Sequence, residues 1–326
     1  MKKQLMSWAL LGMVFLTACQ KEDVDPNSGN NTNNNPVPSA TALNQLFDQQ
    51  RAAMKQSFTI DAAQGGTVVG MQGTKFRIPP STFVDQAGNV VTGNVSIKII
   101  EIYDRGSMVL ANMPTMGKNS QGENALLISG GEYYFEATQN GSKLSVNQSI
   151  DVWMPTDNPS QEMDLFVATT NDQGNSVWDS APIDSSNVVV TEDSTGMYYY
   201  SQYDGIYQGV EYNWINCDYF YGNSDPKMDL KVKLPAGSTG ENSKLFIVIE
   251  GLNAIGELYD WDQDGIFEFN NIPIGLKVHL IALNVVDDVL YHKLLSITTT
   301  EGELVTIEEM EIMTQQELLN LINNLP

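Results

Sequence analysis

Residues 74–99 read TKFRIPPSTFVDQAGNVVTGNVSIKI, and this stretch sets the class of fold. Apolar residues alternate with polar ones near both of its ends, over Phe76–Ile78 and again over Val95–Ile99. A period of two places successive side chains on opposite faces of a strand. Both ends are therefore predicted to be half-buried β-strands, with a turn at Asp85–Asn89 between them.

The same alternation continues to about residue 155 and returns at residue 227. Polar and glycine-containing stretches, such as Gln139–Ser142 and the pair Gly130-Gly131, are interpreted as turns between short antiparallel strands. These signals predict a mainly β chain of two or three β-sandwich domains. The predicted parts are a sandwich over 58–155, a β-rich aromatic connecting region over 156–226 and an Ig-like sandwich over 227–312.

A short helix is predicted at each end of the β region. Over 41–57, apolar residues recur at spacings of three and four, which gives a helix one apolar face. This helix is expected to pack on the first sandwich. Over 313–326, Thr314 can cap a second helix, because Glu317 follows three residues later as in a capping box.

The N-terminus has the pattern of a lipoprotein export signal. Two lysines precede the apolar run Leu5–Leu16, which is too short to span a bilayer and leads into the lipobox LTAC at residues 16–19. We expect residues 1–18 to be removed and Cys19 to carry a palmitate-type lipid. Residues 19–40 are rich in Asn, Pro and Ser, and are predicted to be a disordered tether.

Residues Gln20–Asp23 carry a second targeting signal. They resemble the short acidic tag that follows the lipidated cysteine in surface lipoproteins of the Bacteroidota. The resemblance implies a protein anchored in the outer membrane by lipid and exposed on the cell surface. The alternative is an anchor that faces the periplasm.

A series of motifs between residues 64 and 155 resembles a known β-domain. The motifs include GGTVVG at 65–70, TKFRIPP at 74–80 and GNVVTG at 88–93. They are similar to the recurring β-domain of Bacteroidota surface and secreted proteins and, more distantly, to the ZU5 interaction domain. Later segments, WINCD at 214–218 and IPIG at 272–275, resemble the same lipoprotein group. The resemblance implies a ZU5-like sandwich and a docking role, and it carries over no catalytic residue.

Composition excludes some classes of function. The formal net charge of −23 becomes −25 once the two lysines of the signal peptide are removed. Such a chain repels phosphate, so nucleic-acid binding is excluded and attachment to the membrane is left to the lipid. Because Cys19 is committed to lipid, Cys217 has no partner for an intramolecular disulfide. It is predicted to be buried, and the alternative is an intermolecular bond.

The sharpest local motif is DWDQDGIFE at residues 260–268. Its order of carboxylates and glycine matches a calcium loop, because a hard cation needs several oxygen ligands from one tight turn. The candidate calcium ligands are Asp260, Asp262, Asp264, the carbonyl of Ile266, and Glu268. Asn271 replaces the usual bidentate glutamate, and the flanks have strand character, so a polar hairpin turn is the alternative.

Aromatic residues concentrate between Tyr198 and Tyr221. Flat rings can stack on sugars or anchor a protein partner. The candidate stacking residues are Tyr203, Tyr207, Tyr212 and Trp214. The alternative is that these rings fill the seam between two β-domains.

Catalytic patterns are scarce in this chain. His279 and His292 both lie within apolar strand patterns and are expected to be structural. We therefore predict a non-enzymatic lipoprotein of the cell envelope that acts as a binding or scaffolding component for a protein or glycan, with no required cofactor. One alternative is a calcium-dependent glycan-binding module, and another is a carbohydrate-active enzyme that uses two carboxylates.

Overall fold

A computed structural model describes residues 37–170, 176–181, 188–203, 214–222 and 225–326 of the chain. The described part is mainly β and contains three helices, which confirms the predicted fold class. The signal peptide, Cys19 and most of the tether lie outside the described residues.

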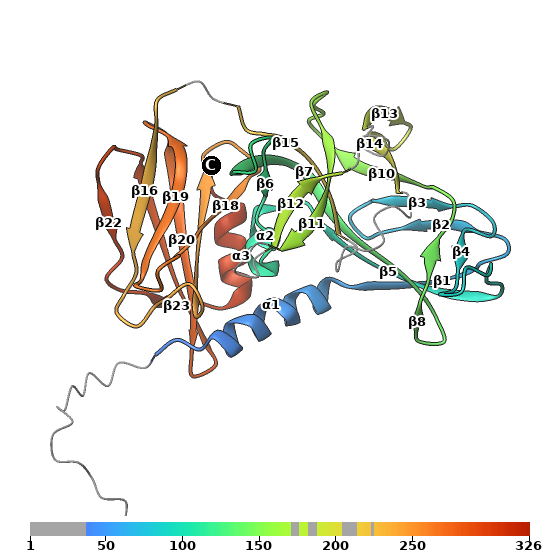
Figure 1. The fold of residues 1–326 in the computed structure, drawn as a ribbon, viewed down its shortest axis with the longest axis horizontal. Coiled ribbons are helices and arrows are strands. Elements are labelled where there is room, and N and C mark those ends of the chain that lie inside the picture. Colours follow the sequence, from blue (N-terminus) through green and yellow to red (C-terminus); the bar gives the residue numbers. More distant parts are fainter. Residues whose placement is uncertain (1–36, 171–175, 182–187, 204–213, 223–224) are drawn as a thin grey trace, which may run out of the picture. The chain divides into compact units, whose positions relative to one another are not determined.

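Two sheets form the first sandwich, with β5 and β7 in one and β3 and β10 in the other (Figure 1). The larger sheet has the order β1-β5-β7-β15-β11-β12-β6, with β8 paired to β7. Its strands are β1 (Gln56–Asp61), β5 (Asn94–Ile102), β6 (Met116–Lys118), β7 (Asn124–Gln139), β8 (Ser142–Lys143), β11 (Asp164–Thr170), β12 (Ser176–Ser180) and β15 (Trp214–Phe220). The smaller sheet has the order β13-β14-β10-β3-β2, with β2 (Gly66–Val69), β3 (Lys75–Ile78), β10 (Ile150–Thr156), β13 (Val189–Asp193) and β14 (Gly196–Tyr203). A separate short pair joins β4 (Phe83–Val84) and β9 (Ser145–Val146).

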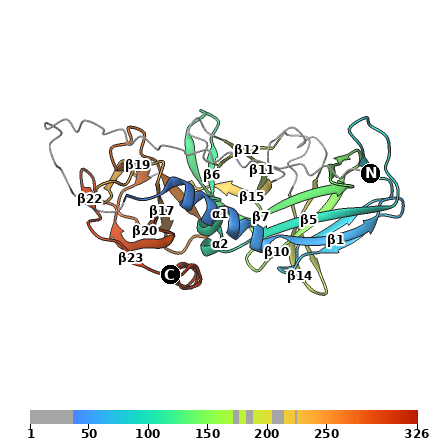
Figure 2. The ribbon, with the colours of Figure 1, turned by 90° about the horizontal axis from the view of Figure 1, so that it is seen from below.

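The alternation seen in residues 74–99 does form the core of this sandwich. Phe76 from β3 and Ile97 from β5 are fully buried in one hydrophobic cluster, so side chains from the two sheets meet. Lys75 and Arg77, which alternate with the buried residues, lie on the other face of β3. Strand β1 follows directly from the first helix and pairs antiparallel with β5 (Figure 2).

The region over 156–226 was expected to connect two domains, and its strands instead complete the first sandwich. Strand β15 lies between β7 and β11 in the larger sheet, and β14 pairs with β10 in the smaller one. The first five residues of β15 are all buried, so its sequence lacks the alternation of a half-buried strand.

A second sandwich follows from residue 227. One sheet has the order β19-β16-β22, with β16 (Lys227–Lys233), β19 (Ile266–Pro273) and β22 (Leu304–Thr306). The other has the order β18-β17-β20-β21-β23, with β17 (Ser243–Ile249), β18 (Ile255–Leu258), β20 (Lys277–Val286), β21 (Val289–Thr298) and β23 (Glu311–Ile312). Val232 and Phe267 from the first sheet pack with Leu245 and Leu280 from the second in one buried cluster.

Three helices accompany the sheets: α1 (Ala40–Met54), α2 (Arg105–Ala111) and α3 (Gln315–Asn323). The predicted capping box is present at α3, where Thr314 and Glu317 each accept from the other's backbone N–H. Helices α2 and α3 lie side by side (Figure 1), and Gly106 allows this, because a Cβ there would stand 2.8 Å from the carbonyl oxygen of Leu319. None of the helices in the described residues has the length and apolar character needed to cross a bilayer.

A third hydrophobic cluster joins the helices to both sandwiches. It contains Phe47 from α1, Ile102 and Trp214 from the first sandwich, and Phe246 and Ile281 from the second. Helix α1 was expected to pack on the first sandwich, and it packs on the second as well. It contacts both because its apolar face lies over a core that the two sandwiches share.

Hydrogen bonds also join the two sandwiches. The backbone N–H of Thr115 donates to the carbonyl of Ile255 at 2.8 Å, and the N–H of Ile255 donates to the Thr115 hydroxyl at 2.9 Å. The N–H of Ser129 donates to the carbonyl of Asn253, also at 2.8 Å. These bonds place the loop over 251–253 against strand β7.

Candidate ligand-binding site

A cavity of about 700 Å³ lies beside this junction. Strands β7 and β15 of the larger sheet, the segment that follows β10, strand β14 of the smaller sheet, and the loop over 251–253 all contribute to its wall. The volume is in the range of small-molecule sites in proteins, which is roughly 300–1,000 Å³.

Gly130 lines the cavity, and the absence of a side chain at Gly130 and Gly131 lets aromatic rings approach this part of β7. A Cβ at Gly130 would stand 2.7 Å from Cε2 of Tyr199, and a Cβ at Gly131 would overlap the ring of Tyr103. Gly131 also has a φ of 125°, which residues with a side chain rarely adopt. Two tyrosine rings can therefore lie directly against the backbone of β7.

The sequence interpretation of Gly130-Gly131 as a turn is wrong, because both residues lie inside β7. The register between β7 and β15 shifts at this place, between Asn216 and Asp218. The glycines mark a bulge and a close approach of aromatic rings, a meaning that glycine in a strand can also have.

Tyr103, Tyr199 and Tyr219 line the cavity, and their hydroxyl groups have different hydrogen-bond partners. The Tyr103 hydroxyl lies 2.7 Å from the Thr74 hydroxyl, and the Tyr199 hydroxyl accepts from the N–H of Ser160 at 2.9 Å. The Tyr219 hydroxyl makes no hydrogen bond with a described residue and is half-buried. Burial raises the pKa of both Tyr103 and Tyr219, so these hydroxyl groups are neutral.

Two asparagine side chains add polar groups to the wall. The Asn253 Nδ2 donates to the carbonyls of Tyr103 and Ser129, which leaves Oδ1 without a described partner. The side-chain amide of Asn158 also makes no hydrogen bond with a described residue. Asp157 is the one charged side chain among the described residues that line the cavity. The wall therefore combines aromatic rings with neutral donors and acceptors.

Two buried acids lie behind this wall. The Ser129 hydroxyl donates to Asn216 Oδ1 at 3.2 Å, and Asn216 Nδ2 contacts Asp218 Oδ2 at 2.6 Å. Both Glu132 oxygens and the Asp218 Oδ1 lack a partner among the described residues. Burial raises the pKa of both acids well above the ordinary range, and the charge of Asp218 raises that of Glu132 further.

The predicted calcium loop forms a turn closed by its own backbone. Buried Asp260 accepts through Oδ2 from the N–H groups of Gly240 and Gly265, at 3.1 and 3.0 Å, and through Oδ1 from the N–H of Asp264. Asp264 Oδ1 accepts from the N–H of Ile266, and Glu268 pairs with a lysine. Asp262 is exposed.

Within the described ranges, no group of three or more His, Cys, Asp or Glu side chains is placed to hold a metal ion. The carboxylate of Asp260 already accepts hydrogen bonds from backbone amides. Calcium binding at this loop stays a prediction, and the geometry favours the alternative of a polar turn.

The candidate stacking residues are not brought together. Tyr203 is buried in the core of the first sandwich, and Trp214 is buried in the cluster shared with the helices. Trp214 thus lies in the seam between the two sandwiches, as the alternative predicted, whereas Tyr203 lies inside the first sandwich. Tyr207 and Tyr212 lie outside the described residues.

The cysteine and the two histidines discussed above lie in the interior of the sheets. Cys217 is fully buried in β15, as predicted. His279 and His292 are also buried, and their Nδ1 atoms contact the Ser296 hydroxyl at 2.7 Å and the Glu311 carbonyl at 2.9 Å. Burial lowers the pKa of His279, so this ring is neutral near pH 7.

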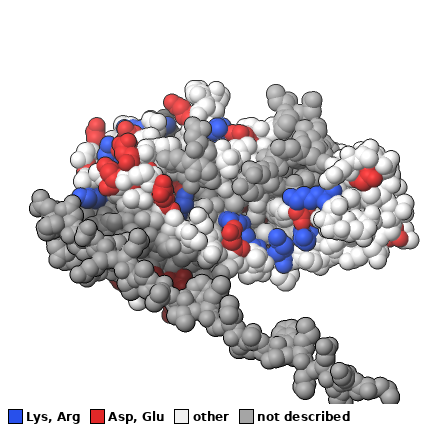
Figure 3. Space-filling view, turned by 60° about the horizontal axis from the view of Figure 1, so that its bottom comes forward, with Lys and Arg blue, Asp and Glu red and all other residues white. Residues whose placement is uncertain are grey.

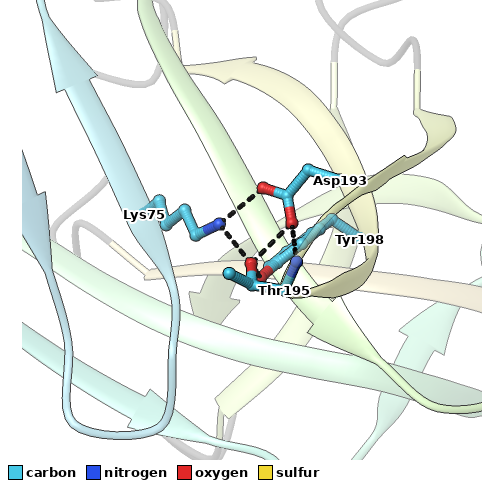
Figure 4. Close-up of polar contacts among 4 residues, drawn as sticks. All are labelled: Lys75, Asp193, Thr195 and Tyr198. Carbon is cyan, nitrogen blue, oxygen red and sulfur yellow. Dashed lines mark hydrogen bonds and ion pairs between the residues drawn. The ribbon is translucent and has the colours of Figure 1, made fainter.

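A polar cluster lies on the outer face of the smaller sheet (Figure 4). Lys75 Nζ donates to Asp193 Oδ2 at 2.8 Å and to the Thr195 hydroxyl at 3.1 Å, and it lies 4.1 Å from the ring centroid of Tyr198. The bond with Asp193 raises the pKa of Lys75 and lowers that of Asp193, so both groups stay charged. The partners satisfy one another and join β3 to the hairpin of β13 and β14 across the face of the sheet.

Charge is spread unevenly over the surface. Lys and Arg side chains gather near a few Asp and Glu on the face shown in Figure 3, and much of that face is uncharged. Part of the positive charge is paired, as at Glu136, which binds Lys98 at 3.1 Å and Lys143 at 3.6 Å.

Comparison with known proteins gives no family assignment, because no family model and no curated protein matches this chain. The resemblance to Bacteroidota lipoproteins and ZU5 domains stays a prediction.

Proposed function

We propose that this chain is a non-enzymatic binding component of the cell envelope that holds a segment of a neutral glycan in the cavity lined by Gly130 and the three tyrosines. The observation that carries the proposal is the wall itself, which contains both tyrosine rings and neutral polar groups. The proposal includes a lipid anchor at Cys19 and exposure on the cell surface.

The chemistry of a sugar matches this wall. A sugar ring has a flat apolar face that can pack on tyrosine rings, and its hydroxyl groups both donate and accept hydrogen bonds. The hydroxyl of Tyr219, the amide of Asn158 and the Oδ1 of Asn253 are the groups that would bond to it. A purely apolar ligand would bury these groups unpaired, at a cost of about 1–3 kcal/mol each.

Charge favours a neutral ligand over an acidic one. The described residues that line the cavity include no lysine or arginine, and Asp157 adds a negative charge at its wall. The whole chain has a formal charge of −23, which also repels anions.

Binding is better supported than hydrolysis. A glycosidase of the usual kind needs two carboxyl groups that flank the scissile bond. The described wall of the cavity contributes one, Asp157. A protein segment is the alternative ligand, as the predicted docking role implies.

The test is calorimetry with the full chain, purified in a detergent that has no sugar headgroup. The titrants are neutral oligosaccharides built from glucose, mannose, xylose or galactose, an oligogalacturonate, and tri-alanine. We expect at least one neutral oligosaccharide to bind. Tyr219→Phe and Asn158→Ala should each weaken its binding by about two- to tenfold, because each removes hydrogen bonds to the ligand.

Two variants serve as matched controls. Tyr291→Phe removes a hydroxyl from a half-buried tyrosine in β21, and Asn94→Ala removes an exposed amide at the start of β5. Both should bind as the parent does. Selective binding of the acidic or peptide titrant would refute the glycan class, and equal binding by cavity and control variants would refute the cavity.

The anchor has its own test in cells. Labelling with a palmitate analogue should mark the parent chain and not Cys19→Ala, and the variant should be found in the soluble fraction. A labelled Cys19→Ala chain would overturn the anchor and leave the cavity unaffected.

A further inference from the structure

A smaller cavity, of about 230 Å³, lies between the turn that joins β6 to β7 and the strands β18 and β19. It adjoins the loop over 260–268 and is separate from the larger cavity. Its described wall contains three glutamates, Glu123, Glu257 and Glu268, and no lysine or arginine.

Glu257 is the central polar group of this wall. Its side chain is 1% exposed, and its Oε1 pairs with Lys244 Nζ at 2.5 Å. Its Oε2 is buried and has no hydrogen-bond partner among the described residues. A buried carboxylate oxygen without a partner is costly, so a donor at this place would stabilise the protein.

Tyr259 presents a second unsatisfied atom. The residue is 5% exposed, and its buried hydroxyl faces the Glu257 carboxyl without forming a hydrogen bond of ordinary length and angle with a described residue. Burial raises the pKa of Tyr259 well above its ordinary value, and the charge of Glu257 adds to this effect. The hydroxyl is therefore protonated and can both donate and accept.

An exposed ring stands at the edge of the cavity. Trp261 is 47% exposed, and its ring centroid lies 5.2 Å from that of Tyr259. A large exposed tryptophan next to carboxylates is a suitable surface for a cation, because the face of an indole ring attracts positive charge.

The other two glutamates add negative charge. Glu268 Oε1 is paired with Lys231 at 2.5 Å, and Glu123 is exposed and accepts from Asn119 at 3.2 Å. Lys244 and Lys231 neutralise Glu257 and Glu268, whereas Glu123 forms no ion pair with a described residue. The wall thus carries net negative charge with both buried and exposed oxygens.

We infer that this cavity binds the guanidinium or ammonium group of a cationic ligand, with arginine as the better fit. The planar guanidinium offers several N–H donors for Glu257 Oε2 and the Tyr259 hydroxyl, and its face stacks on Trp261. The volume suits one long side chain. The group can belong to a free amino acid or to an arginine of a partner chain.

The test is calorimetry of the full chain with Nα-acetylarginine amide, the lysine equivalent, and the citrulline equivalent as the neutral isostere. We expect the arginine compound to bind at least about tenfold more tightly than citrulline, because the loss of charge removes both the ion pair and the cation–π contact. A tripeptide with arginine at its centre distinguishes a free amino acid from an arginine of a partner chain. It should match the affinity of the amide only if the site accepts a side chain from a continuous chain.

Three variants locate the binding. Tyr259→Phe removes one hydroxyl, Trp261→Ala removes the exposed ring, and Glu123→Gln removes one charge from the edge. Each should weaken arginine binding by about threefold or more without lowering the melting temperature by an equivalent amount. Glu309→Gln removes the same charge from an exposed residue outside the cavity and should have no effect.

Two results would overturn the inference. One is equal affinity for arginine and citrulline, and the other is an absence of saturable binding at millimolar ligand. In either case the cavity is not a site for a guanidinium group.

Discussion

Buried acidic residues make the stability of this protein depend on pH at the scale of single residues. Glu132 and Asp218 are fully buried, and their pKa values are raised by burial. Asp151 shows the opposite outcome: burial alone would raise its pKa, but hydrogen bonds from Tyr200, Arg77 and Gln202 outweigh burial and lower it. The two kinds of acid affect stability in different pH windows.

The first prediction concerns pH and stability. A carboxyl group with a raised pKa keeps its proton in the folded state, while the unfolded chain releases it above about pH 4. The contribution of Glu132 and Asp218 to the free energy of unfolding is therefore complete below that pH and is lost as the pH rises. The double variant Glu132→Gln and Asp218→Asn should melt at a higher temperature than the parent at pH 8.

Melting curves between pH 4.5 and pH 8 test this prediction. The difference between variant and parent should shrink toward the acidic end. A constant difference across the range would contradict it. Glu309→Gln, an exposed acid, is the control for net charge.

The second prediction concerns Asp260. This residue accepts three backbone N–H groups, so Asp260→Ala should destabilise the fold by about 1–3 kcal/mol. If the loop is a turn held by these bonds, chemical denaturation should give the same loss in calcium and in EDTA. A rise in melting temperature with calcium that disappears in Asp262→Ala and Asp264→Ala would establish the calcium site instead.

At the scale of elements, local patterns gave the strands and helices but not their partners. The alternation around Phe76 and Ile97, and the cap at Thr314, depend on neighbours in sequence and were predictable. The position of β15 depends on burial on both faces, which removes the alternating signal. The pair Gly130-Gly131 was predicted to be a turn and is a bulge inside β7. Both structures favour glycine, so composition alone does not distinguish them.

The cavity could not be predicted in the same way. Its polar and aromatic groups come from Tyr103, Asn158, Tyr219 and Asn253, which are far apart in the sequence. Tyr219 belongs to the concentration of aromatic residues between Tyr198 and Tyr221. Nothing in the sequence separates it from the rings of Tyr203 and Trp214, which are buried.

The third prediction tests the link between the two sandwiches. The Thr115 hydroxyl bonds to the carbonyl of Leu127 and to the N–H of Ile255. Thr115→Val keeps the shape of the side chain but removes hydrogen bonds from two buried backbone groups. It should therefore lower the free energy of unfolding by about 1–3 kcal/mol. Denaturant titration measures the loss, and Thr300→Val, at an exposed threonine that follows β21, is the control and should change little.

At the scale of the whole molecule, the shared cluster makes the two sandwiches depend on each other. Phe47 of α1 and Leu318 of α3 pack among residues of both. We expect one cooperative transition for the body over 37–326 in scanning calorimetry, with calorimetric and van't Hoff enthalpies in agreement. Two separate transitions would mean that the sandwiches unfold independently.

The buried thiol of Cys217 offers a direct view of such openings. It is the one cysteine in the described residues, it is fully buried, and burial raises its pKa well above the ordinary value. A thiol in that state reacts with alkylating reagents only when the strands around it separate. Its carbonyl lies 2.9 Å from the place a Cβ on Gly130 would occupy, next to the cavity wall. The rate at which the Cys217 thiol is alkylated therefore measures how often the larger sheet opens locally. A ligand bound in the cavity should slow this reaction.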